Sequence, residues 1–149
     1  MYPLHQSETG AFQELVHASE VEFGQLSMLT VAPRRTRGGH YHTHKREWFC
    51  CLHGKCYLVT TNVTTGAQRN IVLDERNKEF IIVNSYETHI VLNPSNRECE
   101  LLVISSEEYD PEKPDTIQQR EYPKECEVHG ITNCPTCKIR VERELVCSQ

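Results

Sequence analysis

The sequence predicts an all-β sandwich or barrel. Short apolar segments recur about every ten residues between residues 23 and 104, and turn-forming Gly, Pro and Asn separate them. No long stretch with the period of an α-helix interrupts this series. The 149 residues, 38% hydrophobic and 25% charged, fit a single globular domain with a substantial core.

The expected strands follow one another closely along the chain. Apolar segments at 12–16 and 23–31 come first, and the second reads as a strand that ends at Pro33. Residues 47–61 read as strand, turn and strand, with the turn at His53-Gly54-Lys55. Shorter strands are expected at 71–73, 80–83, 89–93 and 100–104, separated by turns such as 64–66 and 93–96.

The character of the chain changes after residue 104. Residues 105–125 are polar, acidic and rich in proline, which is typical of an extended arm or linker. A short segment with Cys and His follows at 126–149. We therefore expect a barrel with its N-terminal strands over 1–116, followed by a linker and a small tail over 117–149.

Charge and hydropathy exclude several classes of partner. A formal charge of −5 argues against a nucleic-acid surface, which needs clustered excess basic charge. No secretory leader and no apolar run long enough to span a membrane is present, so a cytoplasmic protein without membrane contacts is expected. Cysteines then stay reduced, and those in predicted strands read as core thiols: Cys50, Cys51, Cys56 and Cys99.

The most informative segment runs from His40 to Gly54. In it, one residue separates His40 from His42, four separate His42 from Glu47, and six separate Glu47 from Gly54. On a strand His40 and His42 share a face, and a following turn would return Glu47 to them. Neutral imidazoles and a carboxylate suit a divalent Zn, Fe, Mn, Ni or Cu ion with open coordination positions. His89, on a later strand, is the best fourth ligand. The alternative is a histidine-rich surface strand that binds no metal.

These residues resemble the two motifs of the cupin superfamily. Gly39-x-His-x-His-x(4)-Glu-x(6)-Gly resembles the first motif, and His89-x-x-x-Asn93 resembles the end of the second. Cupins usually have Pro-x-Gly-x-x before that histidine, whereas this chain has 84–88 as Asn-Ser-Tyr-Glu-Thr. The resemblance implies a double-stranded β-helix, or jelly roll, and a homodimer as the default assembly.

A closer resemblance covers residues 25–116. The segment 37–49 and the later Tyr109-Asp-Pro-Glu-Lys-Pro-Asp-Thr116 are similar to the C-terminal cupin domain of bifunctional capsular-polysaccharide epimerase/reductases. In that family the cupin domain epimerises a UDP-4-keto-6-deoxy sugar at C3, and a separate domain performs the reduction. No glycine-rich dinucleotide fingerprint is present, so a stand-alone cupin acting on a nucleotide sugar is expected.

The resemblance also suggests roles for individual side chains. The chemistry is proton abstraction next to a ketone, which needs a base, an electrophile for the enolate and a proton donor. Lys45 matches the family motif and is a candidate base or enolate stabiliser. Tyr41 and Tyr86 are candidate proton donors. Tyr57 is a candidate donor or substrate contact, and Arg37 could hold the diphosphate. For the tyrosines, packing within the barrel is the alternative.

The tail carries a second constellation of metal-ligating residues. Two closely spaced pairs would supply four soft ligands to a tetrahedral structural zinc: Cys126, His129, Cys134 and Cys137. A segment this short has too little core to fold unaided, which favours a zinc-knuckle-like site. Its role could be structural, docking or dimer-forming, and the alternative is a reduced tail without metal.

Two other functions compete with the epimerase. The chain could be a non-catalytic metal- or ligand-binding cupin whose zinc tail contacts a partner. It could also be a cupin dioxygenase, in which the same ligands hold Fe(II) with positions open for O₂.

Overall fold

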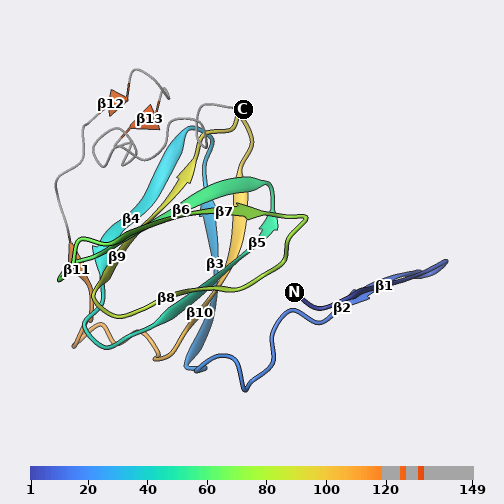
Figure 1. Cartoon of the computed structure of the whole chain (residues 1–149), viewed down its shortest axis with the longest axis horizontal. Helices are drawn as coiled ribbons and strands as arrows, with labels where there is room; N and C mark the ends of the chain where they lie inside the picture. Colours follow the sequence, from blue (N-terminus) through green and yellow to red (C-terminus); the bar gives the residue numbers. More distant parts are fainter. Residues whose placement is uncertain (119–124, 127–130, 133–149) are drawn as a thin grey trace.

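The computed structural model describes residues 1–118, 125–126 and 131–132, in which all regular structure is β-strand (Figure 1). Two antiparallel sheets form the body. One contains, in spatial order, β3 (Gln25–Val31), β10 (Cys99–Ser105), β5 (Glu47–His53) and β8 (Ile81–Val83). The other contains β11 (Ile117–Gln118), β4 (Arg35–Tyr41), β9 (Glu87–Asn93), β6 (Lys55–Asn62) and β7 (Gln68–Asp74). The predicted all-β, jelly-roll architecture is confirmed.

The core lies between the two sheets. Alternate residues of the strands point inward, as expected for sheets that each bury one face. Val31, Leu58, Val91 and Leu101 are almost fully buried and belong to one apolar cluster. The predicted core thiols are confirmed, because these four are free and completely buried: Cys50, Cys51, Cys56 and Cys99.

The turn at Gly54 carries the chain from one sheet to the other. Strands were predicted on both sides of it, and both form. They do not pair with each other, however, because β5 pairs with β10 and β8, whereas β6 pairs with β7 and β9. Gly54 has a φ of 83°, and a Cβ there would come within 3.1 Å of the Glu98 carbonyl oxygen. The turn therefore requires glycine.

Both ends of the chain carry small hairpins. Among the strands that the structure describes, β1 (Leu4–Ser7) and β2 (Gly10–Gln13) pair only with each other, and they project from the body (Figure 1). The apolar segment at 12–16 contributes to a strand only as far as Gln13, where β2 ends. Near the other end, β12 (Glu125–Cys126) pairs with β13 (Ile131–Thr132). His129, Cys134 and Cys137 lie outside the described residues, so the tail zinc site stays a prediction.

The segment 106–116, which we call the strap, does not leave the barrel as the expected arm. The Ser106 amide donates to the Arg46 carbonyl (2.9 Å), and the Tyr109 amide donates to the Gln25 side chain (2.9 Å). After the strap, β11 pairs with the end of β4. The chain therefore folds back across the end of the barrel that contains His40. No helix long and apolar enough to cross a membrane occurs in the described part of the chain.

Candidate active site

A β-bulge directs His40 towards β9. The register between β4 and β9 shifts between Gly38 and His40, so that His40 lies opposite His89. Gly38 and Gly39 have φ angles of 101° and 84°, which residues with a Cβ rarely adopt. A Cβ on Gly38 would lie 2.5 Å from the His89 carbonyl oxygen. The two glycines thus permit the close approach that brings the imidazole rings to a centroid separation of 4.5 Å.

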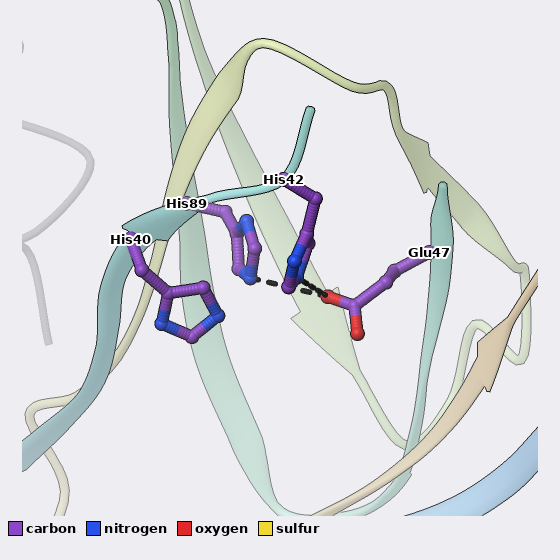
Figure 2. A group of neighbouring side chains, drawn as sticks. All are labelled: His40, His42, Glu47 and His89. Atoms are coloured by element: carbon purple, nitrogen blue, oxygen red, sulfur yellow. Dashed lines mark ion pairs between the residues drawn. The ribbon is translucent and has the colours of Figure 1, made fainter. Parts of the chain in front are cut away.

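The other two predicted ligands come from the β4–β5 loop and the start of β5. His42 follows the last residue of β4, and Glu47 is the first residue of β5. Glu47 Oε2 lies 3.4 Å from His42 Nε2 and 3.2 Å from His89 Nε2 (Figure 2). One ligand atom from each of the four predicted residues lies within 4.8 Å of the others. The structure therefore assembles His40, His42, Glu47 and His89 into one cluster, which we call the His–Glu cluster.

Burial and mutual contact set the protonation of this cluster. Burial, together with the neighbouring His89 and His42, lowers the pKa of His40 to about 4. Burial also opposes charging of His42, but contacts with Glu47 and the Asp115 carbonyl outweigh it and raise the pKa of His42. Burial alone would raise the pKa of Glu47, yet its close contacts with the His42 and His89 imidazoles hold that pKa well below the usual range. Glu47 is therefore a carboxylate at neutral pH.

The donor set fits a divalent metal ion. Three imidazoles and a carboxylate suit a first-row transition metal or zinc. His42 Nε2 is buried and has no hydrogen-bond partner within the described residues, although it faces the Glu47 carboxylate. An unprotonated Nε2 and a carboxylate oxygen are both acceptors, so a cation between them would satisfy both. The histidine-rich surface strand is excluded, because His42 and His89 are buried.

A cleft of about 330 Å³ opens beside the His–Glu cluster. It is lined by the cluster, by Arg37 and Lys45, and by residues of β3 and the strap. The Lys45 residue is only 8% exposed. Within residues 1–118 its ammonium has no hydrogen bond or ion pair with another side chain. The cleft therefore combines the His–Glu cluster with two basic residues, the buried Lys45 and the exposed Arg37.

The predicted tyrosines do not reach this cleft. Tyr41, Tyr57 and Tyr86 are absent from its lining. Tyr57 is 3% exposed, and Tyr86 is exposed beside Tyr41, with ring centroids 6.2 Å apart. Tyr109 of the strap lines the cleft instead. Its position in the Tyr-Asp-Pro motif was the available signal, but sequence reasoning assigned it no role.

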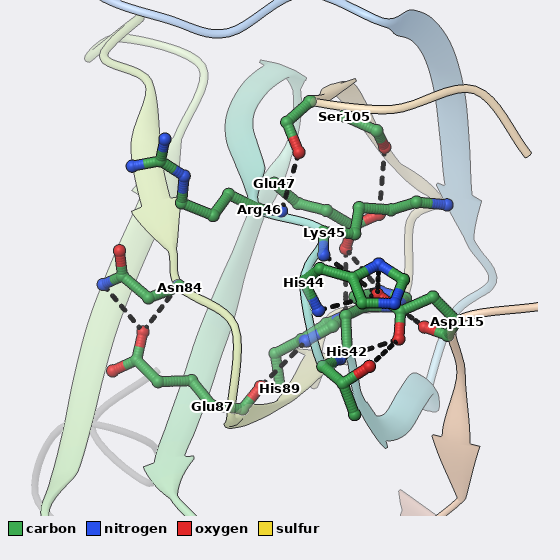
Figure 3. A network of polar contacts seen from close by, with 12 residues as sticks. His42, His44, Lys45, Arg46, Glu47, Asn84, Glu87, His89, Ser105 and Asp115 are labelled. Atoms are coloured by element: carbon green, nitrogen blue, oxygen red, sulfur yellow. Dashed lines mark hydrogen bonds and ion pairs between the residues drawn. The ribbon is translucent and has the colours of Figure 1, made fainter.

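Sequence reasoning also missed two polar residues that hold the site (Figure 3). Ser105, at the end of β10, donates a hydrogen bond to Glu47 Oε1 (3.1 Å) and so orients the carboxylate. The Asp115 side chain is 5% exposed and binds the β4–β5 loop. Its hydrogen bonds outweigh the effect of burial and hold its pKa well below the usual range. His44 lies outside the His–Glu cluster, is 65% exposed, and contacts Glu107 and Asp115.

The two facing sheets and the three-histidine, one-glutamate cluster at the open end of the barrel define a cupin jelly roll. The family model described as polysaccharide biosynthesis C-terminal domain matches residues 5–117, and the chain belongs to this family. It is 32% identical over 114 residues to the UDP-2-acetamido-2,6-beta-L-arabino-hexul-4-ose reductase of Pseudomonas aeruginosa. That match covers 76% of this chain and 30% of the reductase, so the chain spans less than a third of that relative.

Solved structures show the same fold. The capsular polysaccharide assembling protein CapF of Staphylococcus aureus superposes with a TM-score of 0.63 at 22% identity, over 81% of this chain and 35% of CapF. The dTDP-6-deoxy-D-glucose-3,5-epimerase RmlC of Legionella pneumophila, in complex with dTDP-4-keto-L-rhamnose, gives 0.66 at 17% identity, over 78% and 69%. NovW, a 4-keto-6-deoxy sugar epimerase of Streptomyces spheroides, gives 0.64 at 17% identity, over 74% and 63%.

Proposed function

We propose that this protein is an epimerase of nucleotide-linked 4-keto-6-deoxy sugars that inverts a carbon next to the ketone. The observation that carries the proposal is the Lys45 side chain, which lies in the same cleft as the His–Glu cluster and has no ion pair within residues 1–118. Support also comes from the relatives, because RmlC and NovW are named as 4-keto or 6-deoxy sugar epimerases and share the fold. The family description places its members in polysaccharide biosynthesis.

A 4-keto group acidifies the hydrogens on C3 and C5, so the reaction needs removal of one proton and its return to the opposite face. We assign removal of the proton to the neutral amine of Lys45, whose Nζ thereby becomes an ammonium; Lys45 lines the cleft and makes no competing ion pair within the described residues. The hydroxyl of Tyr109, which lines the cleft from the strap, is assigned the return of a proton to the opposite face, and exchange with solvent then restores both groups. Arg37, which lines the same cleft and is exposed, would bind the diphosphate.

We further propose that the His–Glu cluster holds a divalent metal ion through His40, His42, Glu47 and His89. When bound, such an ion would polarise the ketone oxygen and stabilise the enolate charge. Ser105 would keep the Glu47 carboxylate in its orientation through the 3.1 Å hydrogen bond. The proposal is supported by His42 Nε2, which has no hydrogen-bond partner within the described residues and lies 3.4 Å from that carboxylate.

The test is deuterium wash-in from D₂O at C3 or C5 of UDP- and dTDP-linked 4-keto-6-deoxy sugars, followed by NMR and mass spectrometry. We expect wash-in with the metal-loaded full chain, its loss on chelation, and its recovery on metal addition. His40→Ala and Lys45→Met should abolish it, whereas Lys113→Met, which changes an exposed lysine outside the cleft lining, should not. Unchanged exchange in His40→Ala would contradict the metal assignment.

The same experiment separates the competing functions. Absence of exchange across the whole sugar panel would favour the non-catalytic metal- or ligand-binding cupin. Iron in the purified protein together with O₂ consumption would favour the dioxygenase. The expected homodimer is a separate proposal, supported by exposed Leu4 and Phe12 on the projecting β1–β2 hairpin. Light scattering after size exclusion would measure it.

A further inference from the structure

The Asp115 carboxylate accepts hydrogen bonds from several residues of the β4–β5 loop. The backbone amides of Thr43, His44 and Lys45 donate to it at 2.8, 3.0 and 2.9 Å. The Thr43 hydroxyl adds a fourth hydrogen bond at 2.5 Å, and His44 Nδ1 lies 3.1 Å away. Three consecutive amides donate hydrogen bonds to one buried carboxylate. These hydrogen bonds are charge-assisted and shielded from water, so each is stronger than a hydrogen bond at the surface.

The backbone of the same residue fixes the ring of His42. The Asp115 carbonyl oxygen forms a hydrogen bond with His42 Nδ1. A carbonyl can only accept, so Nδ1 carries the proton and Nε2 is the nitrogen that faces the cluster. Nε2 indeed lies 3.4 Å from Glu47 Oε2. One residue of the strap therefore determines both the tautomer of a cluster histidine and the path of the loop that carries Lys45.

Few other contacts restrain this loop. It lies between β4 and β5 and pairs with no strand in the described part of the chain. The Tyr86 amide donates to the His42 carbonyl (2.7 Å), and Ser106 exchanges hydrogen bonds with Arg46 at the other end. Between these two anchors, the Asp115 carboxylate holds the backbone of Thr43, His44 and Lys45, while the His44 side chain also contacts Glu107.

We propose that Asp115 is a positioning residue: it acts through Lys45 and His42, and so makes the strap part of the catalytic apparatus. The inference rests on the proposed epimerase function. Because Asp115 does not line the cleft, whereas its neighbour Thr116 does, its removal should slow the reaction more than it weakens sugar binding.

The principal variant is Asp115→Asn, which keeps the size of the side chain but replaces one acceptor oxygen with a donor. Asp110→Asn is the matched control, since Asp110 lies in the same strap and, within residues 1–118, its side chain accepts only from the nearby Glu112 amide (2.9 Å). We expect kcat for deuterium exchange to fall about 10- to 100-fold in Asp115→Asn with KM changed less than about threefold, and no effect in the control. Thr43→Val, which removes only the hydroxyl donor, should lower kcat about three- to tenfold and serves as the test if Asp115→Asn does not fold.

A readout independent of activity keeps this inference separate from the proposed function. Long-range ¹H–¹⁵N NMR of His42 should show the Nδ1–H tautomer in the wild type and a mixture in Asp115→Asn, whether or not any sugar is turned over. A positioning role is overturned if the variants keep kcat and the tautomer unchanged. It is also overturned if KM rises as much as kcat falls, or if Asp110→Asn produces the same changes.

Discussion

Gly38→Ala tests whether the bulge in β4 is what allows the two strands of the site to approach. Two separate costs follow from the structure. A residue with a Cβ at a φ of 101° costs about 1–2 kcal/mol in backbone strain. The new methyl group would also lie 2.5 Å from the His89 carbonyl oxygen, an overlap with backbone that costs about 1–3 kcal/mol. We therefore expect a loss of about 2–5 kcal/mol in the free energy of unfolding.

Two other glycines separate these costs. Gly66 has a φ of 73° and open space around its would-be Cβ, so Gly66→Ala should show the strain alone, about 1–2 kcal/mol. Gly24 has no positive φ, but its Cβ would lie 2.5 Å from the Glu107 backbone, so Gly24→Ala should show overlap alone, about 1–3 kcal/mol.

Urea unfolding followed by fluorescence of Trp48 measures all three variants, with the m-value checked for constancy. Co(II) titration should show weaker binding in Gly38→Ala and unchanged binding in Gly66→Ala, because only the former displaces His89. A Gly38→Ala protein no less stable than Gly66→Ala, with unchanged Co(II) affinity, would refute the reasoning.

Two further predictions concern the cleft and the closed end of the barrel. Lys45→Met should abolish deuterium exchange yet leave the free energy of unfolding unchanged or higher, since Lys45 is only 8% exposed and its side-chain nitrogen has no ion pair within residues 1–118. A loss of more than about 1 kcal/mol in the free energy of unfolding in urea would contradict this. Asn93→Ala should cost about 2–4 kcal/mol, because the fully buried amide donates to the carbonyls of Val31 (2.9 Å) and Arg97 (2.7 Å). The exposed Asn96→Ala control should change stability by less than about 0.5 kcal/mol, and equal losses in both would be the contrary result.

The strands could be predicted because burial imposes a local pattern. Residues 87–93 are buried throughout, and their apolar run together with the following turn marks a central strand. Pairing could not be predicted in the same way. The Gly54 turn looks like a hairpin turn, but whether β5 and β6 pair depends on distant strands. β5 pairs with β10, about fifty residues further along the chain, and β6 pairs with β9, about thirty residues further along.

The four cluster residues could be predicted because three of them are close in sequence: His40 lies near the end of a strand, His42 lies in the following loop, and Glu47 begins the next strand. The fourth ligand, His89, lies on β9, which pairs with the strand of His40. The turn before His89 shows why a departure from a motif need not move a ligand. Tyr86 stands where the cupin motif has glycine, and it adopts the left-handed conformation itself, with a φ of 60°. Its amide and carbonyl bond to His42 and Val63, which hold this conformation in place.

Long-range polar contacts were beyond the reach of sequence. Asp115 lies about seventy residues from the amides that it binds, and a proline-rich acidic segment is locally indistinguishable from a solvated linker. The predictions for the tyrosines missed Tyr109 for the same reason, because which tyrosine lines the cleft depends on where the strap crosses it. Hydrophobic period specifies faces of strands, but it does not specify which loop returns to cover an open end.

The two predicted metal sites make separate demands on metal content. The His–Glu cluster combines three imidazoles with a carboxylate, whereas the tail set is dominated by thiolates and would bind zinc in a closed tetrahedron. We expect two metal ions per full-length chain by elemental analysis after reconstitution with zinc. Cys134→Ser with Cys137→Ser should remove one ion and leave deuterium exchange intact.

His40→Ala with His89→Ala should remove the other ion and abolish exchange, because His40 and His89 face each other across the cluster. Cys50→Ser is the control for loss of a thiol in general, since this buried cysteine lies outside both groups of neighbouring ligand atoms and should lower stability without changing the metal count. Since the thiolate set binds zinc through deprotonated sulfur, its ion should be the first lost on acidification with a chelator present. One ion per chain in the wild type, retained in the tail variant, would show that residues 126–149 bind no zinc and that the cluster alone holds the metal.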